Sequence, residues 1–301
     1  MRKLMLLLPL LVLLGGCAAE PAVPKDPPVP TVPVISVWVT SAEALVQMDV
    51  ETYVAGVVAG EMPSSWPDEA LRAQAILART YVLKFISEKE SRYPGADIST
   101  DITEAQAYDA DAVDSRILAA VAATRGEVLM ADDGTLPYAW FHAHSGGRTA
   151  LARESLDWQG AEPAHTRVTD GMEADSAPWS ATFTEADFLA ACRDAGHPVG
   201  SCRDLAIGTT GPSGRAVTLT ADGISMNAAR LRISLGSTRM RSTLLTELTV
   251  EDGVVRMAGL GYGHGVGMSQ WGARALAEAG WPAGEIALHY YNGLGVVRVW
   301  E

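Results

Sequence analysis

The stretch Gly259-Leu260-Gly261-Tyr262-Gly263-His264-Gly265-Val266-Gly267-Met268-Ser269-Gln270-Trp271 places glycine at every second position and then leaves the repeat. It lacks the G-x-G-x-x-G spacing of a dinucleotide fingerprint. Glycine at this density lets the backbone approach a ligand closely, and Ser269 can cap a helix over 269–279. The segment therefore predicts a ligand-contacting loop that enters a helix, with the Trp271 indole available to a sugar face. His264 is either a sugar contact or a hydrogen-bonded loop histidine.

Length and charge narrow the class of protein. The 301 residues can bury one large or two modest cores. Thirty-six acidic against 23 basic side chains give a formal net charge of -13, which repels phosphate backbones and argues against a nucleic-acid partner. A neutral or cationic ligand, or a sugar polymer, fits better. Three cysteines are too few for a disulfide scaffold or a four-thiolate zinc site.

The N-terminus carries an export signal. Two basic residues precede an apolar run over 4–14, which is too short to span a membrane as a mature helix and leads through two glycines to Cys17. The end of this run resembles the lipobox of bacterial lipoproteins. We therefore expect a signal peptide over 1–16, lipid on Cys17, and a proline-rich tether over 17–33. An ordinary signal peptide with a chance cysteine is the alternative.

These features predict a cell-envelope lipoprotein that works outside the cytoplasm and is anchored by lipid rather than by a helix. Because Ala18, not aspartate, follows the cysteine, outer-membrane placement is expected in a cell with two membranes.

Strands and helices are expected in groups rather than in strict alternation, which favours the α+β class over a doubly wound sheet. One domain is expected over 34–301. Its expected elements are strands over 34–40 and 44–48, helices over 50–60 and from about 67 to 88, a helix ending at 124, a hairpin of 127–130 with 137–142, a helix over 184–194, strands over 205–209, 216–220, 243–250 and 254–257, and helices over 269–279 and 285–291.

Glu61 is the sharpest catalytic candidate. It is expected at the C-terminal end of a helix beside Met62, Pro63 and Trp66. The helix dipole and apolar neighbours both disfavour its charged form. A carboxyl group that stays protonated near neutral pH can act as a general acid, which cleavage of a glycosidic bond requires. The alternative is a structural glutamate at a helix end.

Arg79 falls on the apolar stripe of the long expected helix. A guanidinium drawn toward a core needs a carboxylate or backbone oxygens to offset its desolvation, so an ion pair is expected. A buried strut is favoured over direct substrate contact.

His142 and His144 are two residues apart and share a face if the strand continues, a geometry that can bind zinc. Zinc needs a third ligand, and no cysteine or histidine follows closely until His165. Contact with a glycan, or packing beside a loop, is therefore the default interpretation.

Cys192 and Cys202 are expected to form a disulfide. An exported chain meets an oxidising compartment, and the glycines and proline between the two residues let that segment turn back. Two buried free thiols are the alternative.

An ordered series of short motifs resembles the SpoIID/LytB family. The motifs are Glu61-Met62-Pro63, Gln74-Ala75 through Tyr81, Gln106-Ala107-Tyr108, Phe141-His142 through Gly147, Gly261 through Ala273, and Tyr290-Tyr291. The resemblance spans roughly 34–299. It implies a lytic transglycosylase of the bacterial cell wall that acts on peptidoglycan glycan strands, preferably those without stem peptides.

The resemblance also assigns roles within a glycan-binding cleft. Glu61 matches the catalytic acid, and the positions that line or brace the cleft are Arg79, Tyr81, His142, Ser145, His264 and Gln270. Some members bind zinc through a cysteine where this chain has Ser145, so no metal or other cofactor is expected.

One carboxyl group suffices for the implied reaction. Hydrolases of glycosidic bonds use two carboxylates, whereas a transglycosylase can use one group as acid and then as base while the substrate's own C6 hydroxyl attacks. A competing hypothesis is a non-catalytic glycan-binding activator of a cell-wall amidase. A third is a zinc amidase built on His142 and His144.

Overall fold

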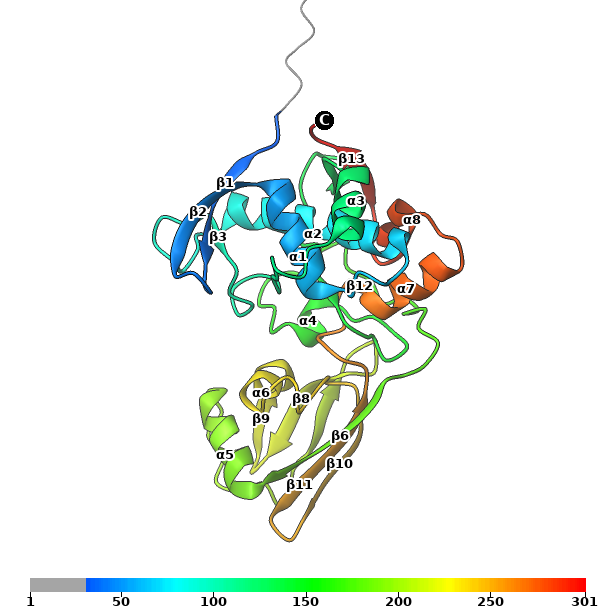
Figure 1. Cartoon of the computed structure of the whole chain (residues 1–301). Helices are drawn as coiled ribbons and strands as arrows, with labels where there is room; N and C mark the ends of the chain where they lie inside the picture. The colour runs from blue at the N-terminus through cyan, green and yellow to red at the C-terminus, as the bar shows by residue number, and fades with distance from the viewer. Residues whose placement is uncertain (1–30) are drawn as a thin grey trace, which may run out of the picture.

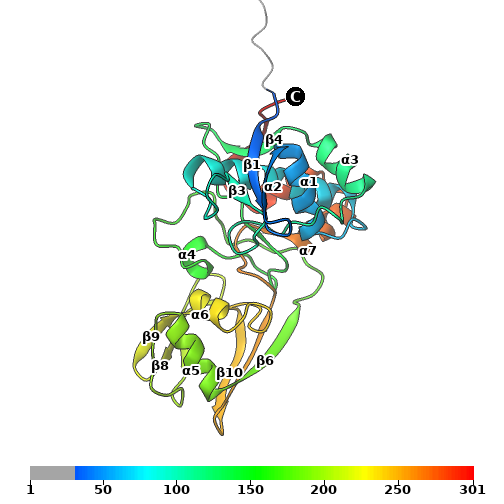
Figure 2. The same cartoon turned by 60° about the vertical axis from the view of Figure 1, so that its left-hand side comes forward.

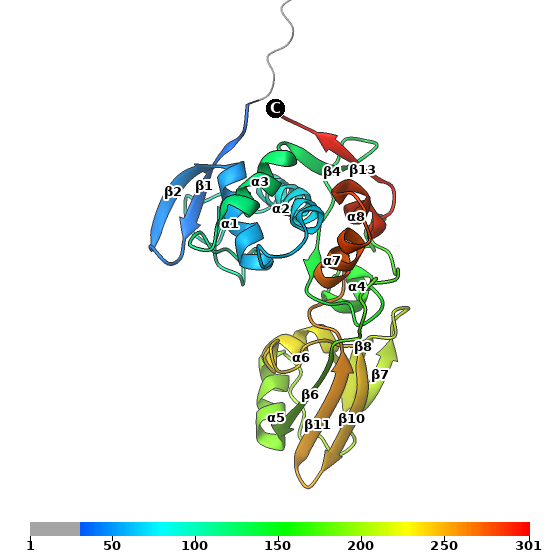
Figure 3. The same cartoon turned by 45° about the vertical axis from the view of Figure 1, so that its right-hand side comes forward.

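A computed structural model describes residues 31–301, which form two lobes (Figure 1). Views from two other sides show the same separation (Figures 2 and 3). The upper lobe contains the beginning and the end of the described chain, and the lower lobe is the middle segment from about 178 to 260. The expected signal peptide, Cys17 and residues 17–30 of the expected tether lie outside the described residues. No helix within 31–301 combines the length and apolar character needed to cross a bilayer.

The upper lobe packs helices around α2 (Asp68–Glu88), which contacts four other helices. Those helices are α1 (Val50–Glu61), α3 (Ser115–Ala123), α7 (Gln270–Glu278) and α8 (Ala283–His289). Small buried residues of α2, such as Ala73, Ala75 and Ala78, let its neighbours approach closely. Apolar residues from all five helices form one core.

Short strands border this helical core. β1 (Val34–Val39) pairs antiparallel with β2 (Ala44–Asp49) and parallel with β3 (Ile98–Ser99). β4 (Glu127–Ala131) pairs antiparallel with β13 (Leu294–Arg298). β5 (Phe141–His142) pairs parallel with β12 (Met268–Ser269). Each of the last two pairs joins segments that are more than 100 residues apart.

The expected hairpin of 127–130 with 137–142 is wrong. The turn itself forms, since Gly134 N donates to Ala131 O at 2.9 Å. Pro137 then has no N–H to donate to a ladder, and the chain leaves β4 free to pair with β13 instead.

The lower lobe has its own core, so the expected single domain over 34–301 consists of two lobes. Its sheets have strand orders β10-β11-β6 and β7-β8-β9. Its elements are β6 (Pro178–Thr184), α5 (Glu185–Asp194), β7 (Ala206–Thr210), β8 (Ala216–Ala221), β9 (Ile224–Asn227), α6 (Ala228–Ser234), β10 (Leu245–Glu251) and β11 (Val254–Leu260). Phe183, Phe188 and Leu219 are buried at its centre. The α+β class is confirmed.

A buried polar seam joins the lobes beside the short helix α4 (Ala152–Ser155). Arg215 has no exposed surface and donates to the carbonyls of Ser145 at 2.5 Å and Arg148 at 2.8 Å. Glu154 accepts from Ser213 N at 3.0 Å. Because buried charges are costly unless they are paired, this seam fixes the segment after β5 against the lower lobe.

Cys192 and Cys202 are both buried in the lower core as free thiols, which contradicts the expected disulfide. The Cys202 thiol is instead directed at Glu185, with Sγ 3.6 Å from Oε1. Burial raises the pKa of the Cys192 thiol to about 11, so it resists forming the reactive thiolate.

Candidate active site

Glu61 is the last residue of α1, and a glycine beside it shapes its surroundings. A Cβ on Gly60 would lie 2.7 Å from Tyr108 N, closer than real Cβ contacts allow. Glycine therefore lets the 107–108 backbone rest directly against the end of α1. This approach brings Ala107 N to Glu61 Oε1, to which it donates at 2.8 Å.

The second oxygen of Glu61 is held from the C-terminal part of the chain. Gln270 Nε2 donates to Glu61 Oε2 at 3.0 Å across 209 residues of sequence. Gln270 is the first residue of α7, where the Ser269 side chain caps the helix by accepting from Gly272 N. The structure thus unites two of the residues that the sequence analysis selected.

The environment of Glu61 suits a proton donor. Burial raises the pKa of the Glu61 carboxyl, and the hydrogen bonds from Ala107 and Gln270 lower it less. Within residues 31–301 no cation forms an ion pair with Glu61. A carboxyl group that is desolvated without a compensating positive charge favours its neutral form.

Two indoles from distant parts of the sequence meet near this site: Trp66 lies five residues after Glu61, and Trp271 directly follows Gln270. Trp66 and Trp271 pack edge to face with ring centroids 5.1 Å apart. The Arg274 guanidinium lies over both rings, 5.1 Å from the centroid of Trp271. Trp271 is 44% exposed and immediately follows Gln270, so a flat apolar surface is available next to the Glu61 partner. Aromatic faces of this kind accept apolar surface at low entropic cost.

Glu173 joins Ser145 to Ser269, the residue before Gln270, and the sequence analysis missed it. Its Oε1 accepts from Ser145 N at 2.6 Å and from the Ser269 hydroxyl, and its Oε2 accepts from the Ser145 hydroxyl at 2.8 Å. Ser145 therefore positions Glu173 and the start of α7 and has no exposed surface for a ligand. Glu173 lies in an irregular segment without periodicity, so no local pattern marked it.

Arg79 is a buried structural residue and does not line a cleft. It has no exposed surface, and its Nη2 lies 2.5 Å from Glu51 Oε2. Nη1 also donates to Glu127 O at 2.9 Å, which ties β4 to α2. The favoured interpretation of an ion pair is confirmed, and direct contact of Arg79 with a glycan does not fit its burial.

Tyr81 is not gathered around Glu61 either. It is half-buried on α2 and stacks on Phe85 with ring centroids 6.3 Å apart. A small pocket beside Phe85 and Trp140 is lined by Tyr81. Burial raises the pKa of Tyr81 to about 12, so its phenol stays protonated.

Two of the selected histidines, His142 and His264, support the glycine-rich loop, with ring centroids 5.7 Å apart. His264 Nδ1 accepts from Val266 N at 3.0 Å, and His142 Nδ1 lies 3.2 Å from Val266 O. Burial, together with the nearby Arg232 and Arg215, lowers the pKa of His264 to about 3. Both rings are therefore neutral near pH 7, and both brace the loop backbone.

The residues present do not fit a zinc ion. His144 uses both ring nitrogens, because Nδ1 accepts from Gly146 N and Nε2 lies 3.1 Å from Asp175 Oδ1. The Ser145 hydroxyl, which replaces a cysteine of some relatives, is bound to Glu173. Across the described residues no three histidine, cysteine, aspartate or glutamate side chains converge as metal ligands would.

Comparison with known proteins identifies the class. The sequence profile described as "Stage II sporulation protein", SpoIID, matches residues 39–130. The chain is 30% identical over 296 residues to the stage II sporulation protein D of Bacillus amyloliquefaciens, which covers 92% of this chain and 81% of that protein. The corresponding protein of Bacillus subtilis is 29% identical over 277 residues, covering 86% of this chain and 77% of its own length. The chain belongs to the SpoIID family.

A further relative bears a different name. The amidase enhancer of Bacillus subtilis is 29% identical over 287 residues, which is 79% of this chain but 39% of that longer protein. Membership of this family makes the function of the chain a cell-wall-related one.

Proposed function

We propose that this protein is a peptidoglycan lytic transglycosylase in which Glu61 is the catalytic acid and base. The observation that carries the proposal is the Glu61 carboxyl, which is partly desolvated, accepts from two amide donors and pairs with no cation of residues 31–301, with a partly exposed indole next to its partner Gln270. Such a carboxyl group is poised to release a proton to a glycosidic oxygen and to take one back.

The proposed reaction needs no water and no second carboxyl group. Glu61 donates its proton to the bridging oxygen as the bond from C1 of muramic acid to that oxygen breaks, which frees a hydroxyl on the leaving sugar. The resulting carboxylate accepts the proton of the C6 hydroxyl on the same muramic acid as that oxygen bonds to C1. A 1,6-anhydro ring forms, and Glu61 is protonated again. Proximity within one sugar ring supplies much of the rate.

Tyr53, a buried residue of α1, lies close enough to both Glu61 and Glu104 for each carboxylate to raise its pKa. Glu104 is therefore a candidate second carboxyl group, but it is held in a structural role. Its Oε1 accepts from Arg92 N at 2.6 Å, and its Oε2 accepts from the Ser91 hydroxyl at 3.0 Å. Glu173 is likewise bound to Ser145 and Ser269, so a hydrolase with two working carboxyl groups is the less fitting mechanism.

Mass spectrometry of the products from purified glycan strands tests the proposal. We expect chains that end in anhydro-muramic acid, which are lighter by one water molecule than chains with reducing ends. Reducing ends would show a hydrolase, and the absence of cleavage would remove the enzymatic proposal.

A second candidate function is a non-catalytic, glycan-binding activator of a cell-wall amidase. The similarity to a protein named amidase enhancer favours it. In that case glycan binding persists, no strand is cut, and a purified cell-wall amidase works faster on peptidoglycan when this protein is added. The Glu61→Gln variant would stimulate the amidase as well as the unaltered chain does.

We also propose that the chain is a lipoprotein of the cell envelope, attached to a membrane through Cys17. The proposal rests on the basic, apolar and glycine-cysteine order of residues 2–17. Replacing Cys17 with serine should move the protein from the membrane fraction to the soluble fraction or block its processing. Unchanged fractionation would contradict lipid anchoring.

A further inference from the structure

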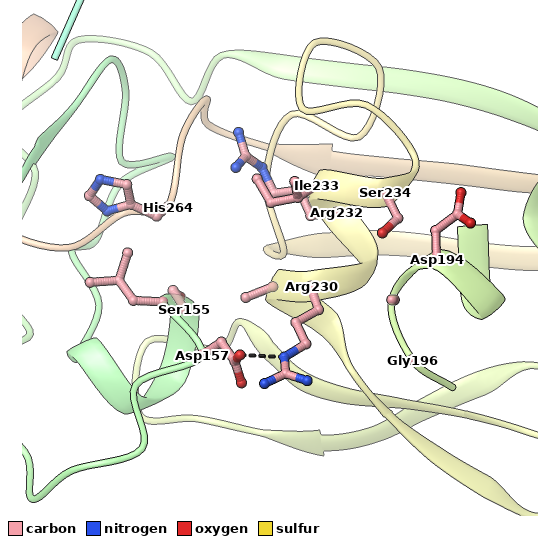
Figure 4. Close-up of a pocket in the computed structure, with 12 residues that line it drawn as sticks. Ser155, Asp157, Asp194, Gly196, Arg230, Arg232, Ile233, Ser234 and His264 are labelled. Atoms are coloured by element: carbon pink, nitrogen blue, oxygen red, sulfur yellow. Dashed lines mark hydrogen bonds and ion pairs between the residues drawn. The ribbon is translucent and has the colours of Figure 1, made fainter. Parts of the chain in front are cut away.

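A cavity of about 610 Å³ lies where the two lobes meet (Figure 4). One wall is the segment 155–157 after α4, and another is α6 of the lower lobe. His264, from the glycine-rich loop, lies at one side, and Asp194 and Gly196 lie at the other. The sequence analysis gave no sign of this cavity, because it did not expect α6.

Arg232 is the unusual residue of this cavity. Its Nε donates to Arg241 O at 3.0 Å, and its Nη2 donates to Ser237 O at 3.4 Å. No carboxylate of residues 31–301 forms an ion pair with it. The side chain is half-buried, and this burial lowers the pKa of the guanidinium. A partly desolvated cation without a carboxylate partner attracts an anionic ligand.

The other charged groups of the cavity do not neutralise Arg232. Asp157 is already bound by the Arg230 guanidinium and accepts from Asn227 Nδ2 at 2.9 Å. Asp194 is exposed and lies on the side of the cavity away from His264. His264 lies close enough to Arg232 for that cation to lower its pKa, and it is neutral near pH 7. The positive charge of Arg232 therefore remains uncompensated on the His264 side.

The cavity is linked to Glu61 through a short chain of contacts. The His264 ring lies beside that of His142, and His142 is the register partner of Ser269 in the β5–β12 pair. The next residue, Gln270, donates to Glu61. His264 and Gln270 are thus six residues apart on one segment, which has the cavity at one end and the partner of Glu61 at the other.

We propose that this cavity is a carboxylate-binding subsite for peptidoglycan, with the Arg232 guanidinium as its anion receptor. This inference rests on the proposed function. On a glycan strand without stem peptides, the carboxylate is that of the lactyl ether on muramic acid. On a strand with stem peptides, that group is an amide and the peptides supply the carboxylates. A guanidinium fork matches either carboxylate in two parallel hydrogen bonds.

Binding of small sugars to the full chain, measured by calorimetry in detergent, tests the subsite without any need for cleavage. N-acetylmuramic acid and N-acetylglucosamine differ by the lactyl ether alone. We expect N-acetylmuramic acid to bind about tenfold or more tightly than N-acetylglucosamine, because a hydrogen bond to a charged group is at stake. A disaccharide that carries a stem peptide forms the third arm, and tighter binding in that arm assigns the carboxylate to the peptide.

Two variants and a control connect the binding to Arg232. Arg232→Gln removes the charge, and Ala229→Glu adds a repelling carboxylate to the cavity wall while the backbone contacts of Arg232 stay in place. Both should lose at least most of the tenfold preference. Arg256→Gln, at an exposed site on β11, should keep it. A thermal melt of each variant confirms that it is folded.

Equal binding of the two monosaccharides, or a preference that both cavity variants retain, would overturn the subsite. If the preference depends on Arg232 but no strand is cut, the subsite stands and the transglycosylase proposal fails. If strands are cut and neither monosaccharide is preferred, the transglycosylase proposal stands and the subsite fails.

Discussion

Helix α1 carries a glutamate at each end, and the two have opposite surroundings. Glu51, in the first turn, meets the Arg79 guanidinium, the Trp300 indole N–H at 2.9 Å and Gly126 N at 3.0 Å. Glu61, at the last turn, meets two amide N–H groups and, within the described part of the chain, no cation. The helix dipole favours a negative charge at the first end and opposes it at the second. One glutamate is therefore paired with a cation and holds the fold, and the other is placed to exchange a proton.

The largest expected effect is at the first end. Arg79→Met removes the cation and leaves Glu51 buried with only neutral partners. We expect the free energy of unfolding to fall by about 3–5 kcal/mol, measured by urea denaturation of the full chain. The double variant Glu51→Gln with Arg79→Met should recover part of this loss, because no unpaired charge remains. A loss below about 1 kcal/mol in Arg79→Met would show that the pair is not a strut.

At the second end, replacing Glu61 by the isosteric glutamine should affect chemistry most, and it should affect stability only through the dependence on pH. Glu61→Gln keeps an oxygen to accept from Ala107 or Gln270 but cannot transfer a proton. We expect glycan cleavage to slow by about 100-fold or more, with strand binding nearly intact. Glu90→Gln, at an exposed site, is the matched control and should keep full activity. Full activity in Glu61→Gln would show that Glu61 is not the proton donor.

The hydrogen bond from Gln270 should set the pH range of that activity. It lowers the pKa of Glu61 against the larger effect of burial. Because the proton donor is the protonated form, activity is present below the raised pKa and is lost as pH rises through it. Gln270→Leu should therefore move the basic limb of the kcat profile to higher pH while it slows cleavage by less than about tenfold. An unmoved limb would mean that another group governs it.

Protonation of Glu61 should also make the stability of the fold depend on pH. Between the ordinary pKa of 4.5 and the raised folded value, the folded protein binds more protons at Glu61 than the unfolded chain does. The contribution of Glu61 to stability is thus present at low pH and is lost as pH rises through this window. Glu61→Gln should lack this contribution in melts recorded across the same range.

The smallest effect is expected at the indole beside Gln270. Trp271→Ala removes an exposed aromatic face that contributes about 1 kcal/mol of sugar binding, so KM should rise roughly fivefold while kcat changes little. Ile102→Ala, at another exposed apolar side chain, should leave KM unchanged. A fall in kcat without a change in KM would place Trp271 in catalysis rather than in binding.

Local patterns predicted where several helices begin. The helices expected over 50–60, 184–194 and 269–279 are capped by Asp49, Thr184 and Ser269, and each of these side chains accepts from a backbone N–H three residues later. A side chain reaches these donors wherever the rest of the chain lies. The strand partners of β4 and β5 were not predictable in this way, because β-pairing can join any two segments.

The amino-acid sequence alone determined the α+β class, most of the helices, Glu61 as the candidate acid and Arg79 as a paired charge. Each follows from residues within a few positions or from the cost of burying a charge. The tertiary structure decided which donors hold Glu61, that Glu173 joins two distant segments, that the thiols are free, and that Arg232 faces a cavity between two cores. These features depend on groups brought together from distant segments, and burial, which shifts the pKa of Glu61, is a property of the whole packed molecule and not of any one stretch.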